Sequence, residues 1–171
     1  ASGATGIDGA SGGQLASTFT STVVKGTTVL SANTWYHFAL VRNGSAVNLY
    51  LNGVSEASAT RTDDFSQTDI LYIGNSRATN QVFQGFISNI RVTKQALYTA
   101  NFTPPTAVLT TTSQSVTAAN VSLLTCQDST FKDNSTNAFT ITAGTTTVKP
   151  VAVSPFTPNS YSNTQITTYG S

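Results

Sequence analysis

Charge and reactive side chains are scarce in this sequence. Charged residues make up 9% of the 171 residues, whereas a typical soluble domain has about 25%. The formal net charge of +1 offers no basic patch, which argues against nucleic acid as a partner. A surface rich in Ser, Thr and Asn depends little on ion pairs, which suits an extracellular or virion-surface protein.

Cysteine, histidine and methionine are almost absent. The single cysteine, Cys126, excludes an internal disulfide, and it cannot form a zinc site of known pattern with the single histidine, His37. No apolar run is long enough to cross a bilayer, so we expect no membrane insertion. Methionine is missing even at position 1, which predicts a processed chain or a part of a longer protein.

Two Asn-Gly pairs punctuate the most regular stretch of the chain. Trp35–Arg42 is an apolar run that ends at Asn43-Gly44, and Ala46–Leu51 ends at Asn52-Gly53. Asn-Gly supplies the two positive-φ positions of a type I′ turn, so we predict an antiparallel meander with Gly44 and Gly53 at positive φ. Because the first strand is apolar on both faces, we expect it to lie centrally, with Trp35 and Leu49 buried.

Other strands are predicted from similar patterns, separated by turn signals and without a long helix. This pattern indicates an all-β, antiparallel two-sheet sandwich. The predicted strands are 18–24, 27–30, 54–59, 69–74, 82–93, 121–126, 138–142 and 146–153, with one helical turn at 95–100.

Glycine recurs with a strict period of three near the beginning of the chain, at positions 3, 6, 9 and 12. This is the collagen signature, and it predicts a trimer; the alternative is a flexible Gly/Ser linker. We therefore divide the chain into residues 1–17 as a collagen-like or Gly-rich linker, 18–105 as the β-sandwich, and 106–171 as a C-terminal β segment.

The motifs of residues 27–105 resemble the laminin-G-like, concanavalin A-like jelly-roll family of bacteriophage tail fibres and virion surface proteins. They are the Trp35 strand, the two Asn-Gly turns, LYIGN at 71–75, GFISNIRVTKQALYT at 85–99 and NFTPP at 101–105. Few strands precede Trp35, whereas residues 122–142 resemble the beginning of such a domain. The sandwich is therefore incomplete or permuted, it receives strands from another chain, or the chain is a fragment of a multi-domain fibre. Strand 121–126 or 138–142 is then expected to pair with the Trp35 sheet within or between chains.

The resemblance also raises the question of glucanase activity. Glycoside hydrolysis needs two carboxylates across the scissile bond, and no predicted strand carries alternating acids. The only glutamate is Glu56, and the acids Asp128 and Asp133 are predicted in loops or at strand ends. We therefore predict that the protein is not an enzyme and that His37 is a packed residue.

Two rim loops supply candidate binding residues. A sugar site would use Asn75, Arg77 and Asn80 as hydrogen-bonding groups and Tyr72 as a stacking surface, with ordinary loop polarity as the alternative. Calcium is the one candidate ion, held by the carboxylates of Asp63, Asp64 and Asp69, with a solvated acidic loop as the favoured alternative.

Together these features predict a non-enzymatic structural and adhesive protein on a virion surface. The leading hypothesis is a trimeric tail fibre that contacts other virion proteins and a host-surface glycan. The alternatives are a capsid decoration or cement protein without a ligand, and a bacterial surface adhesin.

Overall fold

The computed structural model describes residues 6–10, 14–19, 22–62, 70–74, 83–144, 148–151 and 153–156, with side chains from Val24 onward. The described residues form β-strands joined by turns and loops, with two three-residue 3-10 turns, η1 (Ser113–Ser115) and η2 (Ala118–Asn120). The chain divides into two compact units: unit 1 holds residues 1–83 and 98–104, and unit 2 holds 84–97 and 105–171.

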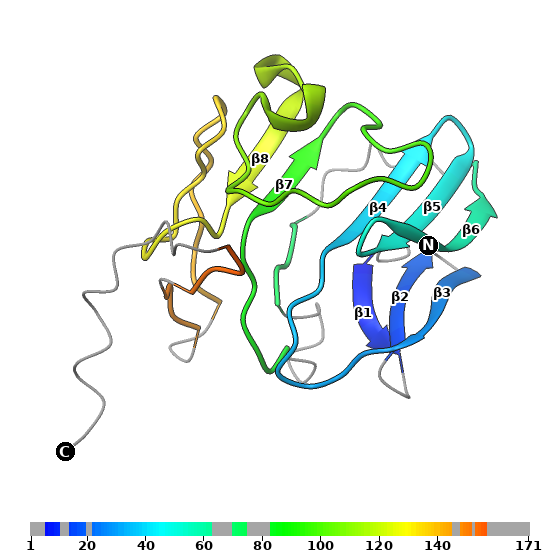
Figure 1. The fold of residues 1–171 in the computed structure, drawn as a ribbon. Helices are drawn as coiled ribbons and strands as arrows, with labels where there is room; N and C mark the ends of the chain where they lie inside the picture. The colour runs from blue at the N-terminus through cyan, green and yellow to red at the C-terminus, as the bar shows by residue number, and fades with distance from the viewer. Residues whose placement is uncertain are drawn as a thin grey trace. The chain divides into compact units, whose positions relative to one another are not determined.

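Unit 1 contains two antiparallel three-stranded sheets (Figure 1). The first has the order β1-β2-β3 and the second has the order β4-β5-β6. Their strands are β1 (Gly6–Ala10), β2 (Gln14–Phe19), β3 (Thr22–Val29), β4 (Phe38–Asn43), β5 (Ala46–Leu51) and β6 (Val54–Thr60).

Both faces of the second sheet are covered within unit 1. Val47, Leu49 and Leu51 alternate along β5, and they form a buried cluster with Val24 of β3. On the opposite face the Tyr50 side chain is 2% exposed and meets the Phe102 ring edge-on. The alternating side chains of β5 therefore place apolar residues on both faces of the second sheet, and each face is covered.

The two hairpin turns confirm positive φ at both glycines. Asn52 (φ 49°) and Gly53 (φ 81°) are the two central residues between the paired Leu51 and Val54, as in type I′. In the first hairpin Asn43 still pairs with Ala46, so its central residues are Gly44 and Ser45 rather than the predicted Asn43 and Gly44. Gly44 takes the positive φ of 60°.

The prediction that Trp35 is buried is wrong. Its side chain is 41% exposed, and it precedes β4, which begins at Phe38. The neighbouring Tyr36 packs against the core cluster in its place, and its hydroxyl accepts the Ser31 N–H at 3.0 Å. Leu49, in contrast, is fully buried as predicted.

The period-three glycine segment also differs from its prediction. Gly6–Ala10 forms strand β1, paired antiparallel with β2, so these residues form neither a collagen-like helix nor a linker. Repeated glycine is compatible with a strand when a partner supplies the backbone hydrogen bonds.

Unit 2 contains a two-stranded sheet in which β7 (Ile90–Thr93) pairs antiparallel with β8 (Val121–Thr125). Val116, Val121 and Leu124 form its buried cluster, with Leu97 and Leu109 packed against it. In this chain β8 therefore pairs with β7, and the described sheet of β4, β5 and β6 does not include it.

Several other predicted elements do not form in the described part of the chain. Of the described residues 83–93 in the predicted strand 82–93, only the last four are in a strand. Residues 70–74 and 138–142 lie outside strands, and residues 95–100 form no helical turn.

Candidate functional site

Four large side chains in unit 1, three from residues 70–72 and one from Phe83, are exposed. The exposed fractions are 70% for Ile70, 60% for Leu71, 45% for Tyr72 and 60% for Phe83. The Phe83 N–H donates to the Gly74 carbonyl oxygen at 2.8 Å, so Phe83 lies beside the end of residues 70–74. We call Ile70, Leu71, Tyr72 and Phe83 the rim patch.

The rim patch contains one of the residues predicted for sugar binding. Tyr72 is accessible, as a stacking surface must be. Asn75, Arg77 and Asn80 lie outside the described residues, and so do Asp63, Asp64 and Asp69 of the predicted calcium loop. Within the part of the chain that the structure describes, no group of three His, Cys, Asp or Glu side chains could hold a metal ion.

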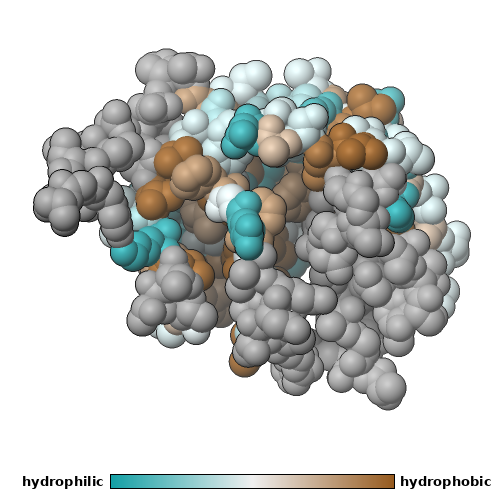
Figure 2. Space-filling model, turned by 90° about the horizontal axis from the view of Figure 1, so that it is seen from below, coloured by the Kyte–Doolittle hydropathy of each residue, from teal (hydrophilic) through white to brown (hydrophobic). Residues whose placement is uncertain are grey.

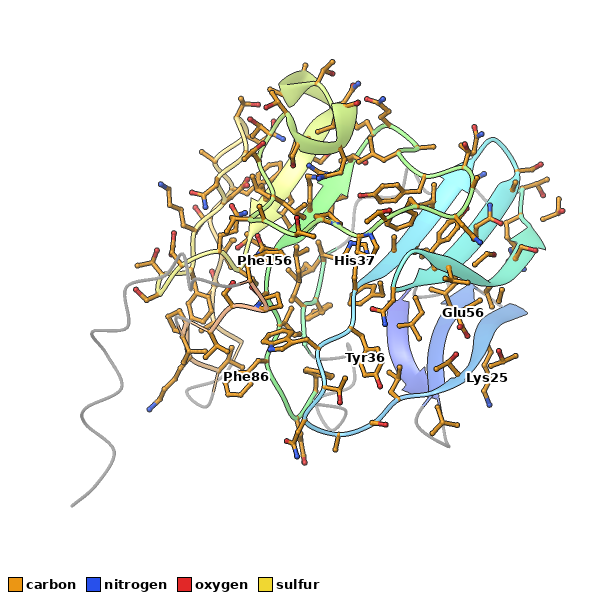
Figure 3. The ribbon with its side chains drawn as sticks, viewed as in Figure 1. Lys25, Tyr36, His37, Glu56, Phe86 and Phe156 are labelled. Carbon is orange, nitrogen blue, oxygen red and sulfur yellow. The ribbon has the colours of Figure 1, made fainter. Side chains whose placement is uncertain are left out.

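The Glu56 carboxylate is fully engaged in joining two strands of unit 1 (Figure 3). Its Oε2 accepts the N–H groups of Thr27 and Thr28 at 2.9 and 3.0 Å, and its Oε1 accepts the Thr28 hydroxyl at 2.7 Å. The Thr28 N–H, helped by the other donors, lowers the pKa of Glu56 below its ordinary value.

Asp133 has a similar role in unit 2. Its two oxygens accept the N–H groups of Leu124, Ser135 and Phe139 at 2.8–3.0 Å, and also the Ser135 hydroxyl. Burial alone would raise the pKa of Asp133, but these donors outweigh it and lower the pKa. The third described carboxylate, Asp128, accepts the N–H of Thr130 two residues later, as in a local turn.

Neither Glu56 nor Asp133 has the environment of a general acid. A general acid needs a carboxyl group whose pKa is raised, whereas the pKa values of Glu56 and Asp133 are both lowered. Their oxygens also accept backbone donors that a substrate would have to displace.

The other candidate reactive groups are structural. His37 packs edge-on against the rings of Tyr98 and Phe102, with ring centroids 6.5 and 5.5 Å apart, which confirms a packed residue. Burial raises the pKa of the Cys126 thiol, which lowers its reactivity as a nucleophile.

One interaction that sequence reasoning missed joins the second hairpin turn to the segment of residues 98–104. The Phe102 N–H donates to the Gly53 carbonyl at 2.9 Å, and the Ser55 N–H donates to the Asn101 Oδ1 at 2.9 Å. The available signal was that the chain contains both Leu51-Asn52-Gly53 and Asn101-Phe102. The two motifs are far apart in the sequence, so no local pattern indicated that they pair. The interaction holds the turn and the segment of residues 98–104 together within unit 1.

Antiparallel sheets covered on both faces define an all-β domain of the sandwich class. The sequence pattern of the concanavalin A-like lectin/glucanases superfamily matches residues 3–101, and the chain belongs to this laminin-G-like family. This confirms the predicted fold class and jelly-roll family.

Comparison with other proteins adds one solved structure. It is an S-layer domain-containing protein (residues 221–444) from Clostridium thermocellum, 23% identical, with a TM-score of 0.39. The similarity covers 50% of this chain and 46% of that one, so the chain spans less than half of that structure. No curated protein matches the chain.

Proposed function

We propose that this protein is a non-enzymatic adhesive module that binds a host-surface glycan through the rim patch. The observation that carries the proposal is the exposure of Tyr72 together with Ile70, Leu71 and Phe83, the last of which bonds to Gly74 through its backbone. Clustered exposed apolar groups mark binding sites, and aromatic faces stack on sugar rings. Figure 2 shows hydrophobic side chains reaching the surface beside hydrophilic ones.

The polar partners of such a site are supplied by the loop that follows Tyr72. We propose that Asn75, Arg77 and Asn80 donate hydrogen bonds to sugar hydroxyls, and that Asp63, Asp64 and Asp69 are solvated rather than calcium-bound. Membership of a superfamily that includes lectins supports a sugar ligand. The engaged carboxylates of Glu56 and Asp133 support binding without hydrolysis.

Glycan binding is tested with the whole chain on an array of bacterial surface polysaccharides. We expect Tyr72→Ala to weaken binding by about tenfold or more, because one stacked ring contributes on the order of 1–3 kcal/mol. The matched control is Phe139→Ala, which removes an exposed ring of unit 2. Both side chains are exposed, so both variants should fold. Equal loss in the two variants, or undiminished binding by Tyr72→Ala, would refute the assigned patch.

We further propose that the protein is displayed outside the cell on a virion, as part of a trimeric tail fibre. The low charge of the chain supports assembly with a partner, because few Lys or Arg side chains protect its sheet edges. A mass measurement in solution tests the trimer, and a stable monomer contradicts it. If the protein binds to virus particles but binds no glycan, it is a capsid decoration protein instead.

A further inference from the structure

The two Asn-Gly pairs of this chain stand in very different surroundings, although they have the same local sequence chemistry. Gly44 is exposed, and a Cβ placed on it would meet no atom within 4 Å. The Asn43 side chain is exposed too, and no described residue forms a hydrogen bond with it. Gly53 is buried in the second turn.

We propose that Asn43 is a site of spontaneous deamidation, and that the fold protects Asn52 from the same reaction. Asn-Gly is the dipeptide most open to this chemistry, because glycine leaves the following backbone nitrogen free to approach the asparagine side chain. The structure supplies the difference between the two pairs.

The reaction needs water and no enzyme, oxidant or reductant. The Gly44 backbone nitrogen loses its proton and attacks Cγ of Asn43, so that a C–N bond forms. The Cγ–Nδ2 bond breaks and ammonia leaves, which gives a cyclic imide. Water then opens the imide at either carbonyl, and the product is aspartate or isoaspartate.

At Asn52 several contacts oppose ring closure. Its Oδ1 accepts the His37 N–H at 2.9 Å, and its own N–H donates to the His37 carbonyl at 2.7 Å. The Gly53 carbonyl accepts the Phe102 N–H at 2.9 Å, so the backbone groups on each side of the Asn52–Gly53 peptide are held by hydrogen bonds. The side chain must leave its partner, and these flanking groups must move, before the Gly53 nitrogen can reach Cγ.

At Asn43 the surroundings favour the reaction. The Arg42 Nε donates to the Gly44 carbonyl at 2.9 Å, so a positive charge lies one peptide away from the Gly44 nitrogen that must lose its proton. Conversion of Asn43 to aspartate or isoaspartate adds one negative charge, so the formal net charge of the chain falls from +1 to zero. The isoaspartate product lengthens the backbone at the last pair of the hairpin, Asn43 and Ala46.

The test follows the native full chain over time in mildly alkaline buffer. Samples are digested with pepsin at acid pH, where imide formation is slow, and tandem mass spectrometry assigns the mass change to a residue. We expect Asn43 to convert at least about tenfold faster than Asn52, since breaking the contacts of Asn52 requires local opening. Similar rates in the native protein, or faster conversion at Asn52, would overturn the proposal.

Two controls separate the effect of the fold from that of the flanking sequence. In concentrated denaturant the two rates should converge; a persisting tenfold difference would show that the flanking residues set it, and would overturn the proposal. The variant Asn43→Gln should lose the early acidic species on ion exchange, because the longer side chain closes its ring far more slowly. An early acidic species that survives in Asn43→Gln would also contradict the assignment.

Discussion

Gly53 shows how one residue can be required for two independent reasons. Its φ of 81° is a conformation that other residues adopt at a cost, and a Cβ there would lie 1.9 Å from the Phe102 carbonyl oxygen. Gly44 shares the first reason, with φ of 60°, but its surroundings are open. Comparing substitutions at Gly44 and Gly53 therefore distinguishes the cost of backbone strain alone from the cost of strain plus steric overlap.

We expect Gly44→Ala to lower the free energy of unfolding by about 1–2 kcal/mol, the cost of a left-handed alanine. Gly53→Ala should cost distinctly more, about 3 kcal/mol or above, because the Phe102 backbone must also move away from the turn. Urea unfolding of both variants measures the difference. Equal losses would show that Phe102 does not approach Gly53 as described.

Residue-scale predictions from the sequence were accurate where a local rule applied. Positive φ at both glycines followed from turn chemistry, and burial of Leu49 followed from alternation. The exposure of Trp35 and the approach of Phe102 to Gly53 depend on segments distant in sequence. No local pattern could indicate which of Trp35 and Tyr36 would face the core.

At the scale of secondary-structure elements, a β-bulge in β6 determines the position of Glu56. Leu49 pairs with Ala57 and Tyr50 pairs with Ser55, so Glu56 is an extra residue of β6. The register between β2 and β3 also shifts where β3 carries Thr27 and Thr28. Two irregular places, on β3 of one sheet and β6 of the other, thus meet at one carboxylate. Bulges commonly redirect a side chain in this way.

The Glu56 contact predicts acid sensitivity of unit 1. Because its pKa is lowered in the folded protein, its contribution to stability is present above the ordinary pKa of about 4.3 and is lost as pH falls through the lower folded value. Glu56→Gln should lower the unfolding free energy at neutral pH by about 1–3 kcal/mol, since one acceptor oxygen becomes a donor.

Thermal unfolding of both proteins at neutral pH and near pH 3 tests this contribution. The gap between wild type and Glu56→Gln should narrow in acid, and Asp133, unchanged in both, cancels from the comparison. A gap that stays constant with pH would contradict a charged carboxylate at this contact.

The prediction of a strand at residues 69–74 was wrong for the described residues 70–74, which are mostly apolar but do not pair with another strand. Ile70, Leu71 and Tyr72 have strong strand propensity, yet they are exposed and lie outside strands. Their exposure also supplies most of the rim patch. Tyr72 was proposed as a stacking surface although it was predicted within a strand, and the exposure of its neighbours could not be read from propensity.

At the scale of the whole molecule the two units are interleaved along the chain. Residues 84–97 leave unit 1, and residues 98–104 return to it before the chain continues into unit 2. The laminin-G-like match ends at residue 101, yet β7 within the match pairs with β8 beyond it. The sequence-based boundary at residue 105 therefore separates the two partners of one sheet.

Pairing of β7 with β8 predicts strong protection of residues 121–125. The Leu124 N–H donates to Asp133, and the strand is held by β7 on its other side. We expect its amide hydrogens to exchange about as slowly as those of β5. Hydrogen exchange with mass detection measures both segments, and immediate exchange of residues 121–125 would contradict the pairing.

The interleaving also sets an order of events on the ribosome. Unit 1 cannot cover the Tyr50 ring until Phe102 has emerged from the ribosome, and by then β7 has also emerged whereas β8 has not. At about 5–20 residues per second, β7 waits a few seconds with both edges open to other nascent chains. Arg91 within β7 and Lys94 just after it place two positive charges on that waiting segment, where charge discourages premature association.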